Sequence, residues 1–154
     1  MTMFQVSIII NKPVSIVSKA LMNPDNFPYW QTDLEKFEVI KKAPGEVGSI
    51  ARLHYLQKGR SYIMEDELIY CEPKRKYVSQ VTGEALSAQV ETTLRPIDNK
   101  TEMNLKWLGK GKVFILKLLL PFLRRRMIKQ SKEELKIFKK LVETRGTDFN
   151  KDQK

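Results

Sequence analysis

Two neighbouring stretches of the chain alternate between apolar and polar residues, and this pattern constrains the fold more than any other. In an extended strand, successive side chains point to opposite faces, so alternation gives the strand one apolar and one polar face. The apolar faces would carry Leu86, Ala88, Val90, Thr92 and Leu94 in the first stretch, and Thr101, Met103, Leu105 and Trp107 in the second. An antiparallel sheet with one such face needs another layer to cover it.

The segment from residue 111 to about residue 143 is the only one long enough to cover that face. Its apolar residues mostly recur every three or four positions, as they do along one side of a helix. They are Leu116, Leu120, Leu123, Met127, Leu135, Phe138 and Val142, with the polar Ser131 as an interruption. Because proline breaks the hydrogen-bond pattern of a helix, we expect Pro121 to kink this helix or divide it in two.

The rest of the chain predicts short elements separated by clear turn signals. Residues 4–10 favour a strand, and the Asn11 side chain could cap a helix that begins near Pro13. A short helix or turn is expected over residues 24–30. Strands then extend to residue 108 and are separated by turns at residues 44–45, 58–59, 72–73, 83–84 and 98–99, a spacing typical of an antiparallel meander.

The overall composition indicates one globular domain without a membrane span. A chain of 154 residues can bury a core, so we assign residues 1–145 to a single domain and the mostly polar residues 146–154 to a disordered tail. The most apolar run, residues 113–123, is shorter than the ~20 residues that a spanning helix needs. Because Cys71 is the only cysteine and residues 1–10 do not resemble a secretion signal, a cytoplasmic location is expected.

The positive charge of the protein is concentrated in its last third. The formal net charge is +10, and residues 100–145 hold 14 Lys or Arg against 4 Asp or Glu, whereas residues 1–99 hold 12 of each kind. The densest group is Arg124, Arg125, Arg126 and Lys129. This basic surface could be a solvated helix face, a contact for an anionic membrane or a contact for RNA phosphates, and the sequence leaves these alternatives open.

Three segments resemble the START-like superfamily, specifically its polyketide cyclase/dehydrase and lipid-transport (SRPBCC) families. Residues 10–30 (INKPVSIVSKALMNPDNFPYW) resemble the family's first strand, its proline-started helix and its short second helix. Residues 44–55 (PGEVGSIARLHY) and 62–81 (YIMEDELIYCEPKRKYVSQV) resemble the following hairpins. The resemblance covers about residues 3–143 and depends on the order and spacing of the segments, because each one alone is a weak motif.

This resemblance implies an α+β helix-grip fold. A curved antiparallel sheet of about seven strands, in the order β-α-α-β6-α, would wrap around the long C-terminal helix and leave a hydrophobic cavity between them. Members of the superfamily bind lipids, quinones, sterols, polyketides or plant hormones, and a minority catalyse cyclisation or dehydration. They share no single set of catalytic residues, so none is transferred to this chain.

The candidate ligand-binding residues come from the apolar faces of the expected strands and helices. Met and aromatic side chains adapt to the shape of a ligand and can line a pocket. Because protein interiors are densely packed, most of these apolar residues are expected to be part of the core instead. The candidates are Trp30, Tyr55, Tyr62, Met64, Asp66, Val90, Met103, Trp107, Leu118 and Phe122, with Thr92, Leu105 and Phe114 as further wall positions.

Asp66 is the one candidate with acid/base chemistry. It falls in register with apolar residues from Tyr62 to Tyr70, and a carboxylate on that face would be desolvated and have a raised pKa. A bulge or the opposite register would instead turn Asp66 outward and Glu65 and Glu67 inward. Because buried unpaired carboxylates are rare, we favour the outward alternative.

No other catalytic or metal-binding pattern is present in the sequence. His54 is the only histidine and is expected on the sheet surface. The spacing of His54 and Cys71 predicts no metal site, and no nucleophile motif, P-loop or dinucleotide glycine pattern occurs, so no cofactor is expected.

We therefore favour a monomeric or dimeric carrier or sensor of a small hydrophobic molecule over an enzyme. The alternatives are a cyclase or dehydratase that acts on a hydrophobic substrate, and a basic module associated with the ribosome, RNA or a membrane.

Overall fold

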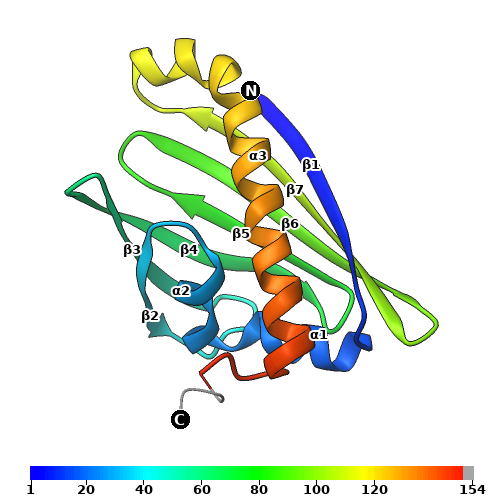
Figure 1. The fold of residues 1–154 in the computed structure, drawn as a ribbon. Coiled ribbons are helices and arrows are strands. Elements are labelled where there is room, and N and C mark those ends of the chain that lie inside the picture. The colour runs from blue at the N-terminus through cyan, green and yellow to red at the C-terminus, as the bar shows by residue number, and fades with distance from the viewer. Residues whose placement is uncertain (151–154) are drawn as a thin grey trace.

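The computed structural model describes residues 1–150, in which one antiparallel sheet is covered by a long C-terminal helix (Figure 1). The strands are β1 (Thr2–Ile10), β2 (Leu34–Lys41), β3 (Ile50–Gln57), β4 (Arg60–Glu72), β5 (Lys76–Thr82), β6 (Leu86–Ile97) and β7 (Lys100–Gly111). The helices are α1 (Val14–Met22), the 3-10 helix η1 (Pro24–Asn26), α2 (Phe27–Trp30) and α3 (Phe114–Arg145). This order confirms the predicted α+β helix-grip fold.

Neighbouring strands are all antiparallel, and the sheet order is β1-β7-β6-β5-β4-β3-β2. The first strand therefore lies beside the last, and the other strands form a meander of hairpins. Each predicted turn falls at the end of one of these hairpins. The two-residue turn between β3 and β4 contains Lys58 and Gly59, whose φ angles are 51° and 80°. Positive φ at both central residues suits a two-residue hairpin.

The alternation predicted for β6 and β7 is confirmed. Val90 pairs with Trp107 and Thr92 pairs with Leu105, so the apolar residues of both strands share one face of the sheet. This inner face meets α1, α2 and α3, and it supplies residues to a core that includes Phe4, Leu94, Met103, Leu135 and Phe138.

Helix α3 begins three residues later than expected, because Gly111 still belongs to β7, where it pairs with Leu86. A Cβ on Gly111 would lie 2.6 Å from the backbone nitrogen of Lys117, so the close approach of strand and helix requires glycine. The helix is continuous through Pro121, but its first part runs across one end of the molecule before the rest turns along the sheet (Figure 1). No helix within residues 1–150 is long and apolar enough to cross a membrane.

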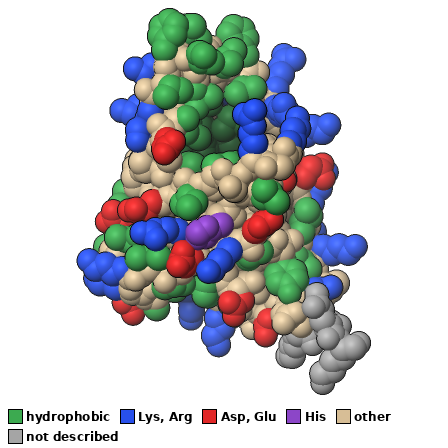
Figure 2. Space-filling view, turned by 90° about the vertical axis from the view of Figure 1, so that its left-hand side faces the viewer, with side chains coloured by type: hydrophobic (Ala, Val, Ile, Leu, Met, Phe, Trp, Pro, Cys, Tyr) green, Lys and Arg blue, Asp and Glu red, His purple; other side chains and the backbone are tan. Residues whose placement is uncertain are grey.

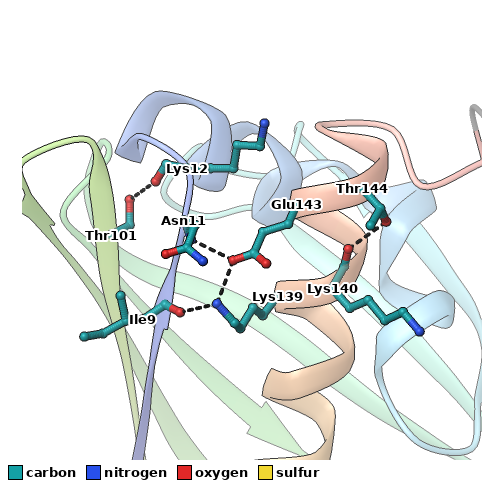
Figure 3. Close-up of polar contacts among 8 residues, drawn as sticks. All are labelled: Ile9, Asn11, Lys12, Thr101, Lys139, Lys140, Glu143 and Thr144. Atoms are coloured by element: carbon teal, nitrogen blue, oxygen red, sulfur yellow. Dashed lines mark hydrogen bonds and ion pairs between the residues drawn. The ribbon is translucent and has the colours of Figure 1, made fainter.

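The end of α3 is fastened to the end of β1 by polar contacts (Figure 3). The backbone N–H of Asn11 donates to Glu143 at 2.7 Å, and the Lys139 ammonium group donates to both Glu143 (2.6 Å) and the carbonyl of Ile9 (2.8 Å). The expectation that the Asn11 side chain caps α1 is wrong, because Pro13 occupies the capping position without a side-chain hydrogen bond. Asn11 contributes its backbone N–H instead, which donates a hydrogen bond to the Glu143 carboxylate on α3.

The expectation of a disordered tail is wrong for residues 146–150. Phe149 is fully buried, with its ring 5.7 Å from that of Phe138, and its backbone N–H donates to the side chain of Asn26 at 3.0 Å. The Asn26 amide in turn donates to the carbonyl of Thr147 at 2.9 Å. The buried Phe149 ring and these hydrogen bonds hold the segment against the core. Residues 151–154, the rest of the predicted tail, lie outside the described residues.

Replacing Phe149 with alanine tests this anchoring. Deleting a buried aromatic side chain typically costs ~3–5 kcal/mol, so we expect Phe149→Ala to lower the free energy of unfolding by about 3 kcal/mol in urea titrations. Phe122→Ala makes the same deletion at a side chain that is 82% exposed, and should change stability by less than ~0.5 kcal/mol. Equal effects of the two substitutions would contradict the burial of Phe149.

Candidate functional site

A cavity of about 390 Å³ lies between the inner face of the sheet and the helices. Its walls come from alternate residues of β3 to β7, from α1 and α2, and from the middle of α3. Figure 2 shows a hollow in the upper half of the molecule, with apolar side chains inside it and above it. The volume falls within the ~300–1,000 Å³ range of small-molecule sites.

The wall of the cavity formed by β5, β6 and β7, which we term the far wall, is mostly apolar and is packed against neighbouring residues. Its residues include Val81, Leu86, Ala88, Val90, Thr92, Leu105 and Trp107. The ring of Trp107 stacks on that of Phe4 at 5.4 Å. A Cβ on Gly109 would overlap the Trp107 ring, so this glycine leaves the space that the indole occupies.

The opening is marked by lining residues whose side chains remain exposed. They are Thr32, Asp33, Gln57, Tyr62 and Gln130. These positions belong to the α2–β2 turn, the β3–β4 hairpin and α3, so the cavity opens between these three segments.

Seven of the ten predicted ligand-binding residues line this cavity. They are Trp30, Tyr55, Tyr62, Met64, Asp66, Val90 and Trp107. Thr92 and Leu105, also predicted as wall positions, line it too. The structure therefore brings together residues that the sequence separates by up to 77 positions, from Trp30 to Trp107.

Three predicted ligand-binding residues do not line the cavity. Met103 is fully buried between Ile8 and Leu94 in the solid part of the core. Leu118 and Phe122 are 57% and 82% exposed. The first part of α3 runs away from the sheet before it bends, so these two side chains do not reach the inner face. Phe114, predicted as a wall position, is exposed for the same reason.

Asp66 faces the cavity, so the outward alternative is wrong. Alternation in β4 is unbroken from Tyr62 to Leu68, and the register shift comes only between Leu68 and Tyr70. Tyr70 is turned outward and its hydroxyl donates to Glu72. Burial raises the pKa of Asp66 to about 6, and a hydrogen bond with Ser79 partly opposes this rise. The carboxyl group therefore changes its ionisation near neutral pH within a mostly apolar site.

Tyr55 and Tyr62 form a stacked aromatic pair in the cavity wall. They are directly opposite each other on β3 and β4, and their rings lie 4.9 Å apart. Burial raises the pKa of the Tyr55 phenol, and the negative charges of Glu134 and Asp66 raise it further. Both phenols are therefore neutral hydrogen-bonding groups near pH 7.

Glu134 is a cavity residue that the sequence did not identify. It accepts hydrogen bonds from the backbone N–H of Thr32 (2.8 Å) and from Gln130 (3.4 Å), and burial raises its pKa. A usable signal was present, because Ser131 and Glu134 continue the helix face of Met127 at i+4 and i+7. Ser79 was missed as well, although Tyr77, Ser79 and Val81 alternate along β5 and share the sheet face that contains Asp66.

The remaining candidates lie away from the cavity. His54 pairs with Glu38 at 2.9 Å across β2 and β3, on the outer side of the sheet as expected. Arg124, Arg125, Arg126 and Lys129 are all exposed on α3, and the Arg124 guanidinium donates to the carbonyl of Met3 at 2.8 Å. Within residues 1–150, no group of three His, Cys, Asp or Glu side chains is arranged to hold a metal ion.

The buried carboxyl group makes stability depend on pH in a testable way. The pKa of Asp66 rises from 3.8 to about 6 on folding. Above pH 6 the carboxyl group is ionised in both the folded and the unfolded protein, and its desolvation lowers the free energy of unfolding. Below about pH 4 the group is protonated in both states, and this destabilisation disappears. A shift of two units corresponds to roughly 3 kcal/mol. We expect Asp66→Asn to be up to about 3 kcal/mol more stable than wild type at pH 7.5, with the difference shrinking toward pH 4.5.

Urea denaturation at both pH values measures this difference. The control is Glu67→Gln, which removes a carboxylate from the adjacent, exposed position on β4. An Asp66→Asn variant whose stability relative to wild type does not change with pH would show that this carboxyl group is not desolvated.

No protein-family model and no curated protein matches this sequence. Solved structures do match closely in shape. A START superfamily protein from Mycobacterium smegmatis has a TM-score of 0.75 at 11% identity, covering 92% of this chain and 97% of that one. The Zhui aromatase/cyclase from Streptomyces sp. R1128 has a TM-score of 0.74 at 15% identity, covering 94% of each chain.

Ara h 8.0201 also matches, with a TM-score of 0.74 at 16% identity over 93% of this chain and 98% of that one. Agreement along nearly the whole length at such low identity establishes the architecture and not a shared activity. The chain has the helix-grip fold of the START-like (SRPBCC) superfamily.

Proposed function

We propose that this protein binds a small, largely apolar molecule in the cavity between the sheet and α3. The observation that carries the proposal is the 390 Å³ cavity itself, because protein interiors are normally closely packed. A ligand that buries ~300 Å² of apolar surface there would gain about 7 kcal/mol before ordering costs, at ~25 cal/mol per Å². The similar folds of a START superfamily protein and an aromatase/cyclase support the proposal by analogy.

The cavity also meets one requirement of the cyclase or dehydratase alternative, since Asp66 is an ionisable group inside it. Acid/base catalysis needs a group that reaches the reacting atoms. Simple binding requires no such placement, so it remains the principal proposal. An Asp66→Asn variant that still binds a candidate substrate but no longer converts it would favour the enzyme.

Filling the cavity should abolish binding. Val90 lies in the far wall on β6, so Val90→Trp would occupy much of the space that a ligand needs. We expect at least a tenfold loss of affinity for the neutral fluorescent probe N-phenyl-1-naphthylamine, measured by titration. Gln89→Trp adds the same side chain to the opposite, exposed face of the strand and should leave the affinity unchanged.

Circular dichroism and thermal unfolding would confirm that both tryptophan variants fold. If Val90→Trp is unstable, Ala88→Leu adds less volume to the same wall and should weaken binding several-fold. Undiminished probe binding by folded variants of this wall would place the probe outside the cavity.

A second proposed function is docking on an anionic membrane surface through the first part of α3. The supporting observation is a set of exposed apolar residues, which we term the apolar cap: Val113, Phe114, Ile115, Leu118, Leu119 and Phe122. Residues 103–132 include nine Lys or Arg and no Asp or Glu. In Figure 2, apolar side chains cover the top of the molecule, and basic side chains lie on both sides of the hollow. Apolar side chains bordered by cations are typical of interfacial membrane binding.

This combination favours a membrane over the other partners. Aliphatic residues such as Ile115 and Leu118 contribute little to stacking on RNA bases. A second copy of the chain would bring the same positive charge to the contact, which opposes association. An anionic bilayer complements both features, because its headgroups attract the cations and its interior accepts the apolar cap.

Flotation with lipid vesicles tests this docking. We expect binding to phosphatidylcholine vesicles that contain 30% phosphatidylglycerol, weaker binding to pure phosphatidylcholine, and at least a tenfold loss in the Phe114→Ser/Phe122→Ser double variant. Val47→Ser removes an exposed apolar side chain elsewhere and serves as the control. Vesicle binding that the double variant retains would contradict the proposal, as would a dimer that the double variant converts to monomer.

A further inference from the structure

The charge of the cavity is opposite to the charge of the protein. Three acidic residues line it, Asp33, Asp66 and Glu134, and no Lys, Arg or His is found among the described lining residues. The chain as a whole carries 28 Lys or Arg against 18 Asp or Glu. In this basic protein, the charged residues that line the cavity are therefore all acidic.

None of these three carboxylates is neutralised by a protein cation. The ion pairs within residues 1–150 use six other acidic residues, namely Glu38, Glu72, Glu91, Glu102, Glu133 and Glu143. Asp33 is exposed at the opening, whereas Asp66 and Glu134 are half-buried. Withdrawing these two charges from water without a partner is costly. A cationic ligand would supply the missing partner.

Asp66 is the carboxylate with the greatest need for a partner. Glu134 already accepts hydrogen bonds from the backbone of Thr32 and the side chain of Gln130, whereas Asp66 has only the hydroxyl of Ser79. Asp66 also lies where the main cavity meets a smaller one of about 50 Å³, and it lines both. Asp66 is therefore accessible from both cavities.

Aromatic rings complete an environment suited to a cation. The stacked Tyr55 and Tyr62 rings share the cavity wall with Asp66, and Trp30 and Trp107 line the same cavity. The face of an aromatic ring attracts an ammonium group, by ~2 kcal/mol or more when water is excluded. A carboxylate or phosphate group on a ligand would instead meet these ring faces and three like charges.

We infer that the ligand of this cavity is an apolar amine, whose ammonium group binds Asp66 and whose hydrocarbon or aromatic body lies against β5, β6 and β7. This assignment rests on the proposed ligand-binding function and names its ligand class. It distinguishes amines from fatty acids and phospholipids, which carry the wrong charge for the site.

The experiment compares three naphthalene derivatives of nearly equal size and shape but different charge. They are 1-naphthylmethylamine, 1-naphthylmethanol and 1-naphthoic acid, each used at pH 7.5 to displace the neutral probe N-phenyl-1-naphthylamine. We expect the amine to bind at least tenfold more tightly than the alcohol, and the acid to bind most weakly. In Asp66→Asn the amine should lose at least tenfold affinity, so that its advantage over the alcohol disappears.

Glu67→Gln is the matched control, because it removes a negative charge from the exposed face of the same strand. It should leave the order of the three compounds unchanged. A second measurement does not depend on any variant: binding of 1-naphthylmethylamine should lower the pKa of the Asp66 carboxyl group, followed by NMR, whereas the alcohol should not lower it.

The possible results separate this inference from the function on which it rests. If the probe binds but the alcohol or the acid competes as well as the amine, the assignment to amines is wrong and a ligand-binding cavity remains. If neither the probe nor any of the three compounds binds, the proposed function fails with it. An amine preference that persists in Asp66→Asn would also overturn the assignment.

Discussion

The structure depends on the packing of one helix against one sheet face, and that packing is uneven along the helix. Toward the C-terminal end of α3, Leu135, Phe138 and Val142 are fully buried and close the core against β1 and α1. Gln130 and Ser131, about one turn before Leu135, and the neighbouring Glu134 line the cavity instead. The cavity exists because the apolar stripe of the helix is interrupted there while the apolar face of the sheet continues.

Most of the architecture could be predicted because it depends on periodic patterns. The alternation along β6 and β7 identified the apolar face of the sheet. The spacing of three to four residues along α3 identified the helix that covers this face. Features that depend on a single residue escaped prediction. Phe149 anchors a polar tail, and Gly111 extends β7 by three residues beyond the expected strand end. The register shift in β4 comes only after Leu68, so it does not turn Asp66 outward. Leu118 and Phe122 fit an apolar helix pattern, but the direction in which the first part of α3 runs cannot be read from that pattern.

The fold also separates the two signs of charge. Cations are gathered on the outside of α3, where water, or an anionic surface, can accommodate them, whereas carboxylates line the cavity without basic partners. Sequence composition registers only the sum of these, a net charge of +10. For this reason the composition pointed toward polyanions, while the interior points toward a ligand of the opposite charge.

The central claim is that the space between the sheet and α3 receives a ligand. Backbone amide NMR during a titration with N-phenyl-1-naphthylamine tests it most directly, because each amide reports its own position. The account predicts saturable shifts concentrated on the cavity-lining residues of β4 to β7 and near Ser131 and Glu134 on α3. Shifts confined to the outer face around Glu38 and His54, or no saturable shifts at all, would contradict it.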